Sequence, residues 1–124
     1  MSQPSRVRFV EHLGRRVLFV DFSYLRERAT VFETIEEVRA VVAIQPPHSL
    51  LTLISVAGAA FDPGVLQALK EVARHNKPFV KAAVLVGLSG LQRLAYAAVL
   101  LFSGREMPAF RDINDAKDWL VARA

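Results

Sequence analysis

Apolar and polar positions alternate at the start of the chain and then give way to a continuous apolar run. Residues 6–10 alternate between the two kinds, residues 11–15 contain a glycine, and residues 17–22 are almost wholly apolar. Alternation with a period of two is typical of a strand covered on one face, whereas a continuous apolar run fits a strand covered on both. The pattern predicts a hairpin whose second strand lies inside a sheet.

Apolar positions at helical spacing follow, and a buried strand separates two such segments. The first helix is predicted from about Thr30, which has the spacing of a capping box with Glu33, to the prolines at 46 and 47. Residues 49–56 form the strand. The second helix begins at Asp62 and Pro63, since Asp is a good N-cap and Pro fits the first helical position. The apolar positions of the two helices are Val31, Ile35, Val38 and Val42, and Val65, Leu66, Leu69, Val72 and Ala73.

The same alternation of strand and helix continues to the end of the chain. Residues 80–86 predict a buried strand, 87–90 a tight connection, 91–102 a helix and 107–110 a short edge strand. A last helix over 113–122, capped by Asn114 or Asp112, turns Ala116, Trp119 and Leu120 inward. The order ββαβαβαβα predicts an α/β fold with a mixed, mainly parallel sheet of four or five strands and about four helices.

Length and composition fit one domain over residues 1–124, and we expect residues 1–5 to be flexible. The 124 residues are 52% hydrophobic and carry a formal charge of +4, with no cysteine. The basic residues are scattered rather than gathered in a stripe, so we read the charge as serving solubility and expect no nucleic acid. The uncharged runs 82–92 and 94–104 are shorter than the roughly 20 residues of a membrane span. Without a signal peptide either, the sequence predicts a cytoplasmic protein with no transmembrane segment.

Three loops follow the predicted parallel strands, where ligands and partners usually meet such sheets. They are residues 21–23, 57–64 and 87–93, and we expect them to be neighbours in space.

A weak anion site is predicted at the third of these loops. Gly87, Ser89 and Gly90 precede a helix, whose free N–H groups could hold an anion, with Arg93 or Lys81 as the counter-charge. The spacing matches no phosphate-binding motif. The favoured alternative is that Ser89 is an N-cap and that the glycines only form the turn.

Other polar residues suggest no active site, metal centre or cofactor. His12, His48 and His75 lack a second ligand at metal-binding spacing. Asp21 follows a buried strand beside Ser23, but a general acid–base pair needs a second placed carboxylate or histidine, which the sequence does not supply. An enzymatic reading would rest only on Asp21, Ser23 and Ser89 being neighbours, so we predict a protein that is not an enzyme.

The third helix is more apolar than one packed face requires. One face carries Leu91, Leu94, Ala95, Ala98, Leu101 and Phe102, and the other carries Tyr96, Val99 and Leu100. We take Tyr96, Val99 and Leu100 as an interface, and a homodimer is the simplest way to bury it. The alternative is that another element of the chain covers this surface.

Three stretches of the sequence resemble the SpoIIAA-like branch of STAS domains. They are residues 50–65, residues 77–93, and Phe110 with residues 115–120, which end in Trp119 and Leu120. The resemblance covers nearly the whole chain. It implies the STAS fold and a likeness in shape to CRAL-TRIO lipid-transfer domains.

In the family, a partner kinase phosphorylates a serine at the start of the helix after the second central strand. The matching stretch here is Phe61, Asp62, Pro63 and Gly64, where Pro63 stands in the place of that serine. The resemblance therefore implies a binding or regulatory module that lacks the phosphorylation switch but keeps the partner loop. Its partner is a protein or a small ligand. The alternative function is a carrier of a small apolar or lipid-like molecule.

Overall fold

The computed structural model describes residues 5–124, apart from the side chain of Leu91. We expected residues 1–5 to be flexible; residues 1–4 lie outside the described residues, and only Ser5 is described. The Ser5 hydroxyl donates to the carbonyl oxygen of Val7 (3.0 Å) and to the carboxylate of Glu37.

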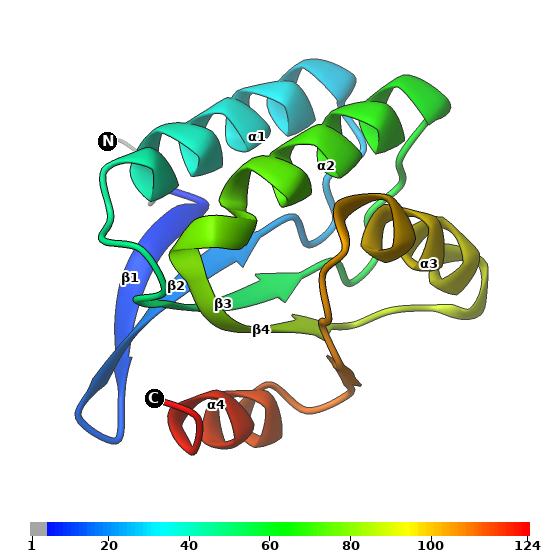
Figure 1. Cartoon of the computed structure of the whole chain (residues 1–124). Helices are drawn as coiled ribbons and strands as arrows, with labels where there is room; N and C mark the ends of the chain where they lie inside the picture. Colours follow the sequence, from blue (N-terminus) through cyan, green and yellow to red (C-terminus); the bar gives the residue numbers. More distant parts are fainter. Residues whose placement is uncertain (1–4) are drawn as a thin grey trace, which may run out of the picture.

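Five strands form one sheet in the order in which they occur along the chain (Figure 1). The first pair is antiparallel and the later pairs are parallel. The strands are β1 (Val7–His12), β2 (Arg15–Asp21), β3 (Leu50–Ser55), β4 (Val80–Val86) and β5 (Ala109–Phe110). The predicted order of elements and the mainly parallel sheet are both confirmed.

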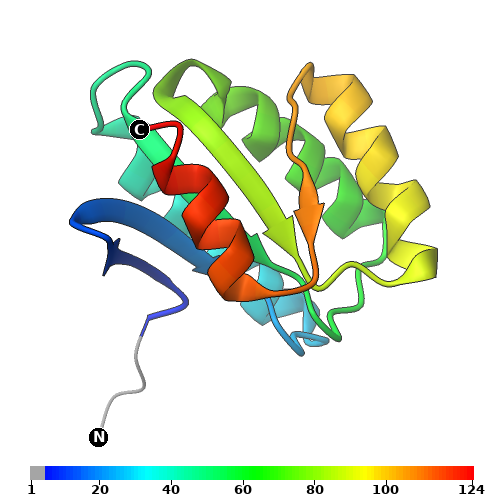
Figure 2. The same ribbon diagram turned by 90° about the horizontal axis from the view of Figure 1, so that it is seen from below.

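Helices cover both faces of this sheet. Helices α1 (Arg28–Ala43), α2 (Pro63–Asn76) and α3 (Gly90–Ser103) lie on one face, and α4 (Ile113–Val121) lies on the other (Figures 1 and 2). A short 3-10 turn, η1 (Lys77–Phe79), connects α2 to β4. None of the helices in the described part of the chain is long and apolar enough to span a membrane.

The central strands are apolar throughout because their side chains enter two separate cores. In β2, Leu18 and Val20 face the layer of α1, α2 and α3, whereas Val17 and Phe19 face α4. Successive side chains of a strand point to opposite faces, so burial of both faces leaves little room for polar residues.

The start of α1 differs from the prediction. The helix begins at Arg28 with Glu27 as the N-cap residue, and the N-cap side chain makes no capping hydrogen bond. Thr30 lies inside the first turn, where its carbonyl oxygen accepts from the hydroxyl of Thr34 (2.8 Å). The predicted capping box of Thr30 and Glu33 is therefore wrong. Tertiary contacts hold this end instead: Arg28 pairs with Asp62 (3.0 Å) and lies over the ring of Phe32.

The ends of α2 and α4 follow local capping chemistry. Asp62 accepts from the backbone N–H of Val65 (2.8 Å), as predicted. Asp112 accepts from the N–H groups of Asn114 (2.8 Å) and Asp115 (3.0 Å), so it is the cap of α4. Ala116 and Leu120 are buried as expected, but Trp119 is only half-buried, with Arg123 stacked on its ring.

Gly87 lies close to the backbone of a neighbouring loop. Its φ angle is +86°, and a Cβ atom there would lie 2.8 Å from the backbone of Ala57. Gly14 has a similar φ of +78° but nothing within 4 Å of the corresponding position. The two glycines therefore share a backbone conformation and differ in surroundings.

We predict that Gly87→Ala lowers the free energy of unfolding more than Gly14→Ala does. Both variants place alanine in the left-handed region, at a cost of about 1–2 kcal/mol. Gly87→Ala adds a clash with the Ala57 backbone, which costs about 1–3 kcal/mol more. Urea unfolding of the two variants and the wild type measures the difference. Equal losses in both variants would show that the two loops can separate freely.

Candidate functional site

The three loops at the carboxyl ends of the parallel strands are neighbours, as the sequence predicted. The N–H of Tyr24 donates to the carbonyl oxygen of Ala57 (2.7 Å), and that of Ala60 donates to Leu25 (3.1 Å). The side-chain amide of Gln92 donates to the carbonyl oxygen of Ala59 (2.7 Å). These bonds join the loops to one another, so their polar groups are largely used within the chain.

The predicted anion site is only partly assembled. Gly87, Ser89 and Gly90 do precede α3, and the N–H of Ser89 donates to the side-chain oxygen of Gln92 (2.8 Å). Lys81, however, lies at the amino end of β4, the end opposite Gly87. At about 3.3 Å per strand residue, this separation excludes Lys81 as the counter-charge. Arg93 is exposed on α3.

The predicted partner loop, residues 61–64, is a helix start at which both oxygens of the Asp62 carboxylate have partners. One Asp62 oxygen caps α2, and the other pairs with the Arg28 guanidinium (3.0 Å). Pro63 is the first residue of α2, and Gly64 lies against Arg28. The ring of Phe61 packs edge-on against those of Phe22 and Tyr96.

Asp21, His12 and His75 also have partners within the chain, and His48 lines a groove on the surface. Asp21 accepts from the N–H (2.9 Å) and the hydroxyl (2.5 Å) of Ser23, with Arg6 nearby. His12 contacts Asp118 (2.6 Å), and His75 contacts Asn76 (2.8 Å). Within residues 5–124 no cluster of three His, Asp or Glu side chains could hold a metal ion.

The face of α3 that was predicted to be an interface is the buried face, and the opposite face is the exposed one. Tyr96 and Val99 are buried, and Leu100 is half-buried. The exposed apolar side chains are Leu94 (79% exposed), Leu101 (86%) and Phe102 (44%). Both faces of α3 are apolar, so hydrophobic pattern alone could not tell which one packs against α2. The side chain of Leu91 lies outside the described part of the structure.

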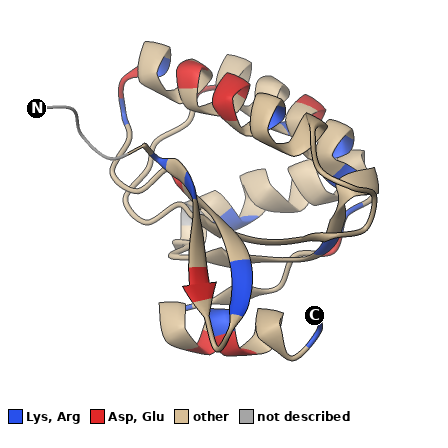
Figure 3. Cartoon of the chain, turned by 90° about the vertical axis from the view of Figure 1, so that its left-hand side faces the viewer, with Lys and Arg blue, Asp and Glu red and all other residues tan. Residues whose placement is uncertain are grey.

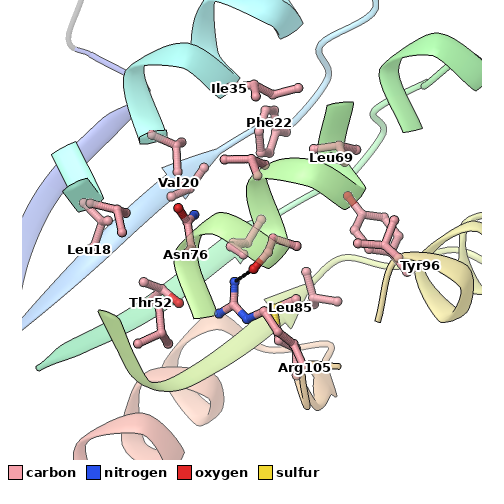
Figure 4. A pocket seen from close by; sticks show the side chains of 18 residues that line it. Leu18, Val20, Phe22, Ile35, Thr52, Leu69, Asn76, Leu85, Tyr96 and Arg105 are labelled. Atoms are coloured by element: carbon pink, nitrogen blue, oxygen red, sulfur yellow. Dashed lines mark hydrogen bonds between the residues drawn. The ribbon is translucent and has the colours of Figure 1, made fainter. Parts of the chain in front are cut away.

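A cavity lies between the sheet and the layer formed by α1, α2 and α3 (Figure 4). Its volume is about 50 Å³, on a scale where one water molecule needs roughly 10–15 Å³. Its walls are mostly aliphatic and aromatic. They include Leu18, Val20, Phe22, Ile35, Leu69, Val72, Leu85, Val99 and Met107.

Three polar atoms in this apolar cavity have no hydrogen-bond partner within the described part of the chain. They are the hydroxyl oxygens of Thr52 and Tyr96 and one terminal nitrogen, Nη2, of Arg105. Other buried hydroxyls are satisfied: that of Ser103 donates to the carbonyl oxygen of Val99 (2.8 Å). Buried polar groups in proteins are nearly always paired with the chain, with ordered water or with a ligand, so these three atoms are the hydrogen-bonding positions that the cavity leaves open.

Burial changes the acid–base properties of two of these groups. It lowers the pKa of the Arg105 guanidinium to about 10, which leaves it a cation at neutral pH. It raises the pKa of the Tyr96 hydroxyl far above its usual value, so Tyr96 keeps its proton. The polar groups that line the cavity are therefore one positive charge, two neutral hydroxyls and the amide of Asn76.

Arg105 also lines a groove on the outside of the molecule, and Val80 and Met107 are the other residues shared by both spaces. The groove is basic, with Glu106 as its single carboxylate among the described residues. Its charged or titratable lining residues are His48, Lys77, Lys81, Arg105, Glu106 and Arg123. Elsewhere, acidic and basic positions are interspersed along α1 and the β1–β2 hairpin (Figure 3).

Sequence reasoning missed this cavity because its residues come from six elements and the segment after α3. Two signals were present. Thr52 interrupts an otherwise apolar run in β3, and Arg105 follows the glycine that ends α3. Neither signal identifies a cavity without the packing of α2 over the sheet.

Comparison with protein families finds no match, and comparison with curated proteins finds none either. Solved structures do match. A protein of the DUF3478 family with a SpoIIAA-like fold, from Shewanella loihica PV-4, is 17% identical with a TM-score of 0.72, covering 97% of this chain and 98% of that one. An anti-sigma-factor antagonist (STAS) domain protein from Planctomyces limnophilus is 15% identical with a TM-score of 0.60, covering 94% and 97%.

Both matches extend over nearly the full length of the chain. At these identities they establish the fold alone. The resemblance seen in the sequence is thereby confirmed at the level of architecture: the chain has a SpoIIAA-like, STAS-type fold.

Proposed function

We propose that the chain is a cytoplasmic, non-enzymatic binding protein that holds a small, mainly apolar molecule in the cavity beneath α2 and α3. The observation that carries the proposal is the set of three unpaired polar atoms in an otherwise apolar cavity. Ligand sites in proteins combine apolar walls with a few placed polar groups in the same way.

Energetics support an occupant. Each buried polar group without a partner costs roughly 1–3 kcal/mol, against a total stability of about 5–15 kcal/mol for a domain. Replacing the three groups by apolar ones would remove that cost. A ligand that bonds to them turns the same groups into its specificity determinants. Ordered water is the competing occupant, and the experiments below separate the two.

This proposal favours the carrier reading over binding through the loops at 57–64 and 87–93. The polar groups of those loops bond to one another, whereas those of the cavity do not. With Pro63 at the first position of α2, the proposal includes no phosphorylation switch there. Contact of the same loops with a protein partner stays a prediction.

We predict that Tyr96→Phe and Thr52→Val stabilise the ligand-free protein, each by about 1 kcal/mol, because each removes an unpaired buried hydroxyl. Ser103→Ala is the matched control, since it removes a buried hydroxyl that has a partner. It should instead lower the free energy of unfolding by about 1 kcal/mol. Urea unfolding of ligand-free protein measures the free energy of unfolding of all three variants. Destabilisation by Tyr96→Phe and Thr52→Val would indicate that ordered water satisfies these hydroxyls.

We also predict that Ala73→Leu fills the cavity and abolishes binding within it. Ala73 is buried on α2 and lines the cavity, whereas Ala40 is exposed on α1, so Ala40→Leu adds the same volume outside. Xenon enters apolar cavities and shifts the NMR signals of the surrounding methyl groups. The methyls of Leu69, Leu85 and Val99 should shift in the wild type and in Ala40→Leu, and stay unchanged in Ala73→Leu.

Native mass spectrometry of the freshly purified wild type adds a direct search for a retained molecule. A wild type that retains none, with no xenon response at these methyls, would contradict the proposed function.

The homodimer predicted from the sequence remains part of the proposal, now through the outer face of α3. Leu94 and Leu101 are largely exposed there, and burying such side chains favours association. We expect Leu101→Glu to shift the protein from dimer to monomer in sedimentation velocity at high micromolar concentration. Ile44→Glu is the control, because Ile44 is equally exposed (82%) but follows α1. A wild type that sediments as a monomer would exclude this dimer.

A further inference from the structure

Arg105 is a half-buried residue whose guanidinium nitrogen Nη2 is fully buried, and no carboxylate of the described residues forms an ion pair with it. Among residues 5–124, the ion pairs join Arg6 to Asp21, His12 to Asp118 and Arg28 to Asp62, and none includes Arg105. Its one hydrogen bond runs from Nη1 to the carbonyl oxygen of Ala73 and is long (3.5 Å). A charge taken out of water needs a partner of opposite sign, because burial alone costs several kcal/mol.

The polar atoms of the cavity are not spread evenly over its wall. Figure 4 shows the guanidinium of Arg105 on the same side as Thr52 and Asn76, while Tyr96 lies on the other side. Nη2 of Arg105 and the Thr52 hydroxyl are both hydrogen-bond donors without a partner. Aliphatic side chains, among them Leu18 and Val20, fill the wall between and above them.

The basic groove outside the cavity reinforces this polarity. Lys77, Lys81 and Arg123 face that groove, and Arg105 lies between the groove and the cavity. A groove lined by one sign of charge concentrates ions of the opposite sign. Its field therefore attracts anions to the position at which Arg105 lacks a partner.

We propose that the ligand of the cavity is a small organic carboxylic acid, bound with its carboxylate on Arg105 and the Thr52 hydroxyl and its short apolar body among the aliphatic side chains. This inference rests on the proposed function and names the class of molecule that the cavity takes. Binding is non-covalent, so the acid enters and leaves unchanged.

A carboxylate fits these donors better than other anions do. Its two oxygens accept parallel N–H bonds from the planar guanidinium. A phosphate group carries up to two charges and more oxygens, whereas Arg105 is the one cationic residue among those that line the cavity. The cavity of about 50 Å³ then limits the part of the acid inside it to about three to five carbon-sized groups, on the scale of one water per roughly 10–15 Å³.

The test is isothermal titration calorimetry with straight-chain acids from propionate to hexanoate and with the matched primary amides. We expect the wild type at neutral pH to bind at least one acid, and to bind its amide at least about tenfold more weakly, since the amide lacks the charge. Arg105→Met should weaken binding of the acid by at least about tenfold. Arg105→Lys should bind the acid with intermediate strength, because it keeps the positive charge but loses the planar guanidinium that donates two parallel hydrogen bonds.

A control variant outside the cavity separates the local effect from a general one. Arg26→Met removes an exposed positive charge outside the cavity and should leave acid binding unchanged. We expect Arg105→Met to remain folded and at least as stable as the wild type without ligand, since it removes an unpaired buried charge.

The outcomes distinguish this inference from the proposed function. Amides that bind as tightly as acids, or acid binding that Arg105→Met leaves unchanged, would overturn the carboxylate inference and leave the cavity as a binding site. Failure of every acid to bind at millimolar concentration would overturn it as well. Only loss of the xenon response and of any retained molecule would also remove the proposed function.

Discussion

The parallel pairing of β2, β3 and β4 between two helical layers is the constraint on which the rest of the structure depends. Each strand contributes side chains to both faces, so every position in its middle must be apolar or must find a partner in the interior. Val17, Val84 and Leu53 meet α4, and their neighbours Leu18, Leu85 and Thr52 meet the other helices. The exceptional residue is Thr52, whose hydroxyl faces the cavity.

The two layers are filled differently. On the α4 side, Leu120 and Ala116 are fully buried against the sheet. On the other side, three helices share a wider surface, and a cavity remains where α2 and α3 meet above β3 and β4. Close packing is the rule in protein interiors. An apolar cavity that contains unpaired polar atoms therefore lowers the stability of the fold, which is typical of sites that serve binding.

Arg105 connects the interior to the surface. It follows Gly104, whose left-handed conformation (φ +68°) ends α3 and turns the chain back toward the sheet. The Arg105 side chain then reaches beneath α2 to the carbonyl oxygen of Ala73, at the border between the cavity and the basic groove. The end of one helix thus places a cation where two spaces meet.

The predictable parts of the structure were those decided by local chemistry. Asp62 with Pro63 marked the start of α2, since the carboxylate and the missing N–H both suit that position. The bounds of β4 followed from an apolar run that only Lys81 interrupts. The start of α1 was predicted wrongly because Arg28 contacts Asp62, a residue distant in sequence. The loops were correctly placed together, since carboxyl ends of parallel strands share one edge.

The sequence by itself determined the order of elements, the parallel sheet and the capped start of α2 at Asp62 and Pro63, because hydrophobic period and capping depend on near neighbours. Tertiary structure alone decided which face of α3 is buried, since both faces are apolar. It also decided that Thr52, Tyr96 and Arg105 meet in one cavity and that Lys81 lies away from Ser89. These contacts depend on how the helices pack over the sheet. The spacing of residues along the sequence does not determine that packing.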